Sequence, residues 1–177
     1  MNFEATPNKV TIYIPEIFLK TQSVIFAIFM LFISTTSSAE TARNLPMDRV
    51  YQGPIRLPDF SGREREYSRF RTKITNEMKT GPNFAGHYAI ITIGCGTGCN
   101  FSFVGDVATG KLFDFPYGGE GYYVLGLQYN VKEKYISAKW VNSEENSCIY
   151  DFLEWDGKKF TSSGPKVIGS REICDLP

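Results

Sequence analysis

The sequence predicts an α+β protein that is mostly β, with an antiparallel meander sheet of about seven strands and one N-terminal amphipathic helix packed on it. Two observations carry this prediction. Residues 63–79 have apolar side chains at every third or fourth position, which is the pattern of a helix with one buried face. After Gly81-Pro82 the pattern changes to short runs of aromatic and β-branched residues separated by glycine-containing links, which is typical of strands.

Residues 40–62 are predicted to be extended and irregular, because prolines interrupt them at positions 46, 54 and 58. The helix follows at residues 63–79, and Gly81-Pro82 ends it. Its outer face is basic, for which a solvated face is the simplest interpretation and contact with a membrane surface or an acidic partner is the alternative. The buried stripe is expected to be Tyr67, Phe70, Ile74 and Met78.

Seven strands are predicted from the aromatic and β-branched runs. They lie near residues 87–93, 101–107, 111–115, 122–129, 135–141, 148–155 and 158–161. Thr109-Gly110 closes one hairpin, and Asp156-Gly157 is the pair preferred in a two-residue type I′ turn. Short links between successive strands predict antiparallel pairing, with the helix over one face.

Residues 1–39 have the pattern of a secretory signal peptide. Lys9 and Lys20 precede an apolar run at residues 24–33, and Ser37-Ser38-Ala39 offers the small residues that cleavage requires. The run is shorter than the roughly 20 residues of a membrane-spanning helix, but an uncleaved segment would anchor the protein through residues 17–33. We therefore expect a periplasmic or secreted protein in which residues 40–62 lead into a single domain at 63–177.

The charge balance argues against a nucleic-acid partner. Without residues 1–39 the chain keeps 17 of its 19 basic and 17 of its 19 acidic residues, so its net charge is zero. Nucleic-acid binding favours a strong basic excess. Contact with a membrane is expected only through the signal segment, if that segment stays uncleaved.

The four cysteines all follow the signal segment, and an even number in an exported protein indicates disulfides. Of the three possible pairings, the spacing favours Cys95 with Cys99 and Cys148 with Cys174. If residues 95–99 form the tip of a hairpin, the first two cysteines face each other closely enough for a disulfide.

The only histidine and two of the cysteines lie at opposite ends of one apolar run, residues 84–99. Eight residues of continuous strand span about 26 Å, which places His87 too far from Cys95 for a catalytic dyad or a shared zinc site. We therefore predict no catalytic residues, no metal site and no cofactor. His87 is expected to end a strand and hydrogen-bond to a neighbouring loop, and binding of an anionic ligand is the alternative.

Binding residues are predicted where rigid or glycine-rich turns present polar and aromatic side chains. A disulfide would hold the loop around position 97, and tyrosines flank the glycine-rich loop at 116–123, where their rings suit sugars or a protein pocket. The predicted binding residues are His87, Tyr88, Thr97, Tyr117, Glu120 and Tyr122.

Four short motifs resemble a family of small exported bacterial proteins of uncharacterised function. They are Phe70-Arg71-Thr72, Gly81-Pro82-Asn83-Phe84-Ala85-Gly86-His87-Tyr88, Gly94-Cys95-Gly96-Thr97-Gly98-Cys99, and Asp106 with Thr109-Gly110-Lys111. The resemblance covers residues 67–140 and implies a bacterial, exported protein, without indicating a substrate. Cys148 and Cys174 lie outside it, which fits an added second disulfide.

These observations favour an exported binding or interaction protein, inhibitor-like in presenting a rigid loop, with an unknown protein or a saccharide as its ligand. The alternative is a small periplasmic hydrolase of cell-wall or carbohydrate material. In that enzyme His87, Asp114 or Glu120 would line a cleft, with the two carboxylates as acid and base.

Overall fold

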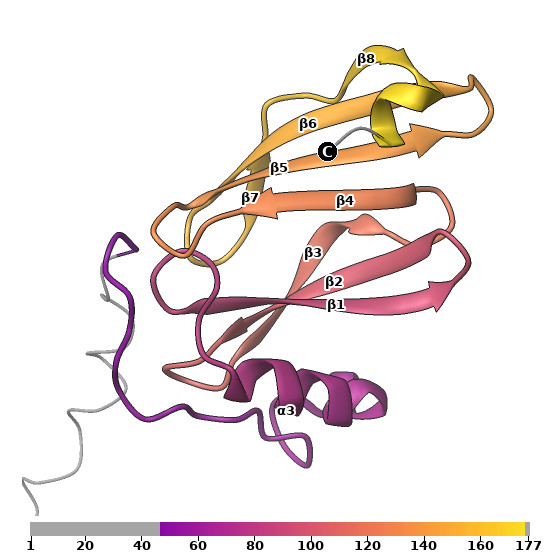
Figure 1. Cartoon of the computed structure of the whole chain (residues 1–177). Helices are drawn as coiled ribbons and strands as arrows, with labels where there is room; N and C mark the ends of the chain where they lie inside the picture. The colour runs from indigo at the N-terminus through magenta and orange to yellow at the C-terminus, as the bar shows by residue number, and fades with distance from the viewer. Residues whose placement is uncertain (1–46, 176–177) are drawn as a thin grey trace, which may run out of the picture. The chain divides into compact units, whose positions relative to one another are not determined.

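The computed structural model describes residues 47–175, so the predicted signal segment at 1–39 and the alternative anchor at 17–33 lie outside the described residues. The described chain is mostly β, with antiparallel sheets of three and five strands and a helix, which confirms the predicted fold class (Figure 1). Its elements are η1 (Arg65–Phe70), α3 (Arg71–Lys79), β1 (Tyr88–Gly96), β2 (Cys99–Asp106), β3 (Leu112–Gly118), β4 (Tyr123–Tyr129), β5 (Tyr135–Asn142), β6 (Ser147–Trp155), β7 (Phe160–Ser162), β8 (Lys166–Ser170) and η2 (Arg171–Asp175).

The strands form two sheets rather than one continuous meander. β1, β2 and β3 pair in that order in the first sheet; β4, β5 and β6 pair in the second, where β7 and β8 both pair with β6. The chain leaves the first sheet at Gly118 and Gly119, whose φ angles of 152° and 83° are ones that side-chain-bearing residues rarely adopt. The sequence pattern does not predict β8, because residues 166–170 lack a regular alternation of polar and apolar residues.

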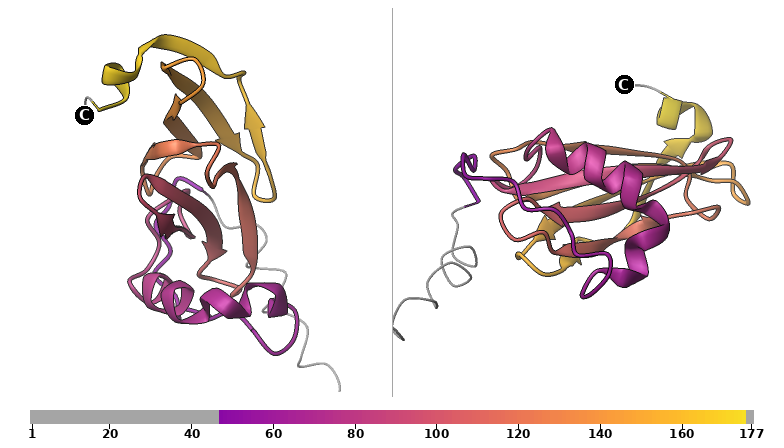
Figure 2. Two further views of the ribbon diagram at one scale, coloured as in Figure 1. Left: turned by 90° about the vertical axis from the view of Figure 1, so that its right-hand side faces the viewer. Right: turned by 90° about the horizontal axis from the view of Figure 1, so that it is seen from below.

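The helix covers one face of the first sheet (Figure 2). Ile74 and Met78 are fully buried and Tyr67 nearly so, while Phe70 is partly buried against the same cluster. The predicted stripe is therefore confirmed. The helix differs from the prediction in its first turns, because η1 is a 3-10 helix and regular α-helix begins only at Arg71.

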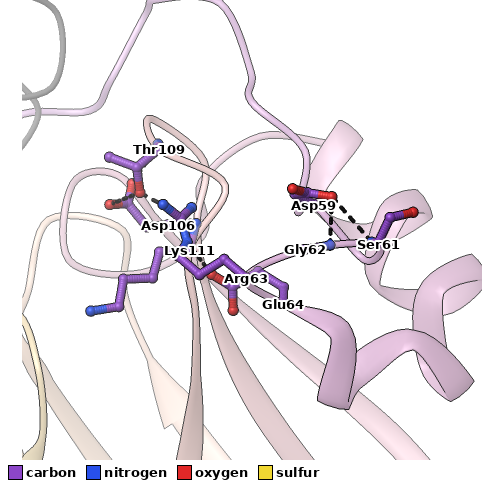
Figure 3. A network of polar contacts seen from close by, with 8 residues as sticks. All are labelled: Asp59, Ser61, Gly62, Arg63, Glu64, Asp106, Thr109 and Lys111. Carbon is purple, nitrogen blue, oxygen red and sulfur yellow. Dashed lines mark hydrogen bonds and ion pairs between the residues drawn. The ribbon is translucent and has the colours of Figure 1, made fainter.

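The segment before the helix has no helix or strand in residues 47–62, as the prolines predict. Its backbone is fixed to the rest of the domain, because the Tyr51 N–H donates to the Gly86 carbonyl at 2.8 Å and the Arg56 N–H to the Val107 carbonyl at 2.9 Å. Asp59 then turns the chain toward the helix: its Oδ1 accepts hydrogen bonds from the N–H groups of residues 61 and 62 (Figure 3).

The larger core lies between the two sheets. Tyr88 and Ile90 project from β1 into this core, whereas Ala89 and Ile91 on the same strand face the helix. Trp155 fills the core from the second sheet and is fully buried. The first sheet is thus covered on both faces, which explains why β1 is a nearly continuous apolar run instead of an alternating one.

Both predicted disulfides are confirmed. Cys95 bonds to Cys99 at the tip of the β1–β2 hairpin, with 5.1 Å between their Cα atoms. Cys148 bonds to Cys174, with 5.4 Å between their Cα atoms, and so attaches η2 to β6. No cysteine of the described chain is free. Two disulfides indicate an oxidising, extracellular-type environment.

Candidate functional site

The motif from Asn83 to Tyr88 forms a buried junction. The Asn83 side chain pairs with the backbone of Ile90: its Oδ1 accepts from the Ile90 N–H at 2.7 Å and its Nδ2 donates to the Ile90 carbonyl at 3.2 Å. Ala85 and Gly86 then turn sharply, with φ angles of 41° and 78°. Their N–H groups donate to carbonyls of residues 133 and 131, in the link between β4 and β5. These residues therefore join the two sheets.

His87 is only 3% exposed, and its ring lies against that of Tyr88 with 4.1 Å between the ring centroids. Its Nδ1 has no hydrogen-bond partner among the described residues, and no side-chain hydrogen bond joins His87 to a neighbouring loop there, contrary to the expectation. The backbone makes the contact instead, since the Val107 N–H donates to the His87 carbonyl at 3.0 Å. Burial lowers the pKa of His87 from 6.5, and the Asp106 carboxylate partly opposes this shift.

Asp106 holds the turn between β2 and β3 (Figure 3). Its Oδ1 accepts from the N–H groups of Ala108 and Thr109 at 2.9 and 3.3 Å, and its Oδ2 accepts from the Thr109 hydroxyl at 2.6 Å. A buried carboxylate is stable there because each oxygen has a donor. Asp106 thus stabilises the turn, and Gly110 completes it with a φ of 78°.

The residues expected to act in a hydrolase are spread along the first sheet. Asp114 pairs with Phe103, which lies four residues along β2 from Val107, the residue bonded to His87. At about 3.3 Å per residue this separates Asp114 from His87 by roughly 13 Å along the strands. Glu120 lies farther still, beyond the end of β3. The structure therefore does not bring the three side chains together.

The structure does bring together the two loops that carry the other predicted binding residues. We call residues 95–99 and 118–124 the paired loops. The Val124 N–H donates to the Gly98 carbonyl at 2.7 Å, and the Gly119 N–H donates to the Asn100 carbonyl at 2.8 Å. The Asn100 side chain adds a bond to the Leu125 carbonyl at 3.0 Å. Three hydrogen bonds therefore connect the two loops and the residues next to them, which are 19 to 26 positions apart in the sequence.

The paired loops present exposed side chains on a backbone that is held in place. Thr97 and Glu120 are both exposed. The disulfide between Cys95 and Cys99 restrains the first loop, and the hydrogen bond from Val124 to Gly98 restrains the second. Val124 has a φ of 51°, which is strained for a β-branched residue and is held by its bond to Gly98. Tyr123 lies so close to Gly98 that a Cβ there would be 2.2 Å from its ring.

An aromatic cluster extends from the paired loops into the domain and contains the two remaining predicted residues, Tyr117 and Tyr122. The rings of Tyr117 and Tyr122 stack with centroids 5.1 Å apart, and both contact Trp140. The Tyr117 hydroxyl donates at 2.5 Å to Asp151, a carboxylate that is only 1% exposed. Because this hydroxyl is occupied and its ring is packed, Tyr117 supports the fold more than it offers a contact surface.

Asp151 is the residue that sequence reasoning missed. It accepts from the hydroxyls of Tyr117, Ser162 and Ser163 and from the Phe152 N–H. Burial alone would raise its pKa, but these hydrogen bonds outweigh burial and lower it. Burial and the bond to Asp151 raise the pKa of Tyr117 to about 12. The sequence contains one signal of this role: Asp151 alternates with the apolar residues Ile149, Leu153 and Trp155 on the core-facing side of its strand.

Residues 47–175 contain no group of three His, Cys, Asp or Glu side chains arranged to hold a metal ion. The same residues include no helix with the length and apolar character needed to cross a membrane. Comparison with models of protein families, with curated proteins and with solved structures finds no match.

Proposed function

We propose that this is an exported binding protein that recognises a protein partner through the paired loops, in the manner of an inhibitor loop. The observation that carries the proposal is the restraint of an exposed tip: the disulfide between Cys95 and Cys99 and the Val124 bond to Gly98 hold Thr97 in one position. A loop that is fixed before binding loses less conformational entropy on association, so each contact it makes contributes more to affinity.

The cysteine chemistry supports the proposed compartment. Disulfides persist in oxidising compartments, and this domain contains two. Together with the signal-peptide pattern of residues 1–39, they support export to the periplasm or beyond. The same location is implied by the resemblance to small exported bacterial proteins, which we retain as part of the proposal.

The hydrolase alternative has less support, because His87, Asp114 and Glu120 lie at different places along the first sheet. His87 is also buried at the junction of the two sheets. A saccharide ligand is the other alternative, and the experiment below separates it from a protein.

The test places a photoreactive amino acid at position 97 of the full chain, expressed in a bacterium that exports it. The matched control places the same group at Lys132, which is exposed in the link between β4 and β5 and lies beside Gly86 rather than the tip. We expect a cross-linked protein from position 97 and none from position 132. Equal cross-linking from both positions, or a product only with glycan, would contradict a protein partner at the paired loops.

A second measurement uses the partner identified in this way. Thr97→Arg enlarges the tip without touching the core, so it should weaken binding at least tenfold, whereas Lys132→Ala should leave the affinity unchanged. An unchanged affinity in Thr97→Arg would exclude the tip as the contact surface.

A further inference from the structure

The charges of the domain are unevenly distributed. Residues 63–79, which form the helix and its first turn, contain six basic and three acidic residues. Residues 80–175 contain eight basic and eleven acidic residues. The helical segment therefore carries a net charge of +3 and the remainder of the domain −3, although the two cancel in the overall composition.

Most of the helix cations have no carboxylate partner. Two are neutralised locally, since Arg63 pairs with Glu64 (Figure 3) and Lys73 with Glu77, both at 2.7 Å. The other four have no ion pair with any residue of the range 47–175, and all are exposed. They are Arg65, Arg69, Arg71 and Lys79.

The position of the helix makes these cations available to a large partner. Ile74 and Met78 face the first sheet, so the opposite side of the helix is directed away from the domain. Figure 2 shows α3 lying along the outside of that sheet, with no other element of the described chain over it. A convex, cationic cylinder fits an extended anionic surface better than it fits a small ligand, which requires a concave site.

We propose that the exposed cations of this helical segment, Arg65, Arg69, Arg71 and Lys79, bind the surface of a membrane that contains anionic phospholipids. Guanidinium groups bind phosphate oxygens through paired hydrogen bonds, and clusters of basic residues are attracted to anionic headgroups. Three of the four cations are arginines, which favours phosphate as the recognised group. This contact is made by the folded domain and is separate from any insertion of the predicted signal segment.

The test is sedimentation of the full chain with vesicles of phosphatidylcholine, either pure or containing 30% phosphatidylglycerol. Any contact of residues 24–33 with lipid is common to both kinds of vesicle, so the difference between the two isolates the electrostatic contribution. The helix variant is Arg65→Gln, Arg69→Gln and Arg71→Gln, which keeps helix propensity high. The matched control removes the same charge from exposed lysines elsewhere, with Lys132→Gln, Lys158→Gln and Lys159→Gln.

We expect the wild-type chain to prefer the anionic vesicles, and this preference to weaken as salt is raised from 0.05 to 0.5 M. At about 1 kcal/mol for each basic residue near the surface, the helix variant should lose on the order of 100-fold in partitioning while the control loses much less. Circular dichroism verifies that both variants are folded. The proposal is overturned if the wild type has no preference for anionic vesicles or if both variants lose vesicle binding equally.

Discussion

The Tyr117 hydroxyl on β3 donates a hydrogen bond of 2.5 Å to the Asp151 carboxylate on β6, and so connects the first sheet to the second. Asp151 lies where the edge of the second sheet is interrupted, between the ladder that β6 forms with β7 and the one that it forms with β8. The hydroxyls of Ser162 and Ser163 donate hydrogen bonds to the same carboxylate at this interruption. The buried Asp151 carboxylate therefore forms hydrogen bonds both to the first sheet and to the chain at the edge of the second sheet.

Tyr117→Phe should lower the free energy of unfolding by about 1.5–3 kcal/mol, because it removes one donor from a buried charged acceptor while keeping the ring stacked on Tyr122. Urea denaturation at pH 7 measures the change. Tyr129→Phe is the matched control, since this residue is exposed and its hydroxyl has no hydrogen-bond partner among the described residues, and it should change stability by less than about 0.5 kcal/mol. Equal effects in the two variants would contradict a stabilising role for the Tyr117 bond.

The stability contributed by Asp151 should disappear in acid. Its folded pKa is below the ordinary value of 3.8, so the unfolded chain binds the proton more readily than the folded one. The contribution is complete above about pH 5, begins to be lost near the unfolded pKa of 3.8 and is gone once the pH has fallen through the folded pKa. Denaturation of the wild type and Asp151→Asn should therefore differ most at neutral pH, and the difference should shrink below pH 4. A difference of the same size at pH 3 and pH 7 would refute this.

His87 should make the protein less stable in mild acid. Burial holds its folded pKa below 6.5, so the domain is stabilised by the neutral ring above pH 6.5, and this contribution is lost as the pH falls from there through the folded pKa. The acidic group facing it is Asp106, which reduces the effect without reversing it. Melting temperatures between pH 7.5 and 5 should fall more steeply for the wild type than for His87→Gln. Parallel curves would show that His87 does not titrate with unfolding.

The two disulfides should differ in their contribution to stability. In the chain-entropy model a ring of about 27 residues contributes roughly 3.5 kcal/mol and a ring of five about 2 kcal/mol. Replacing Cys148 and Cys174 by serine should therefore destabilise the whole domain more than replacing Cys95 and Cys99, as measured by urea denaturation. The second pair of replacements should instead act mainly on the paired loops, seen as faster amide hydrogen exchange at residues 96–98. The opposite ranking would contradict this division.

Local patterns predicted most of the elements, because each depends on neighbouring residues. The short spacing was sufficient to pair Cys95 with Cys99, although in the structure Cys99 faces Gly96 and Cys95 lies at an irregularity of the ladder between Gly94 and Gly96. The division into two sheets depends instead on long-range packing, which no local pattern contains. Asp151 illustrates the limit: its position in β6 indicates a buried carboxylate, but Tyr117 is 34 residues away and Ser162 is 11 away, so its partners could not be identified.

The same limit of local patterns applies to the predicted binding residues, of which some are exposed as expected and others are buried. Thr97 lies on an exposed turn, as the glycines around it suggest. His87 and Tyr88 are buried, because the preceding turn folds into the junction between the sheets and not onto the surface. Turn residues in the sequence indicate a change of direction, but they do not indicate on which side the other sheet will lie.

Gly110→Ala should detach the N-terminal segment from the domain. Gly110 has a φ of 78°, and a Cβ there would be 2.5 Å from the carbonyl oxygen of Leu57. The variant would have to move that backbone in addition to adopting a strained φ, so we expect a loss of about 1–3 kcal/mol in unfolding free energy. Limited proteolysis should also cut residues 50–58 faster, because the Arg56 bond to Val107 lies beside the clash. Gly121→Ala is the control, since nothing lies within 4 Å of its Cβ position; matching losses in both variants would contradict the contact with Leu57 as the cause.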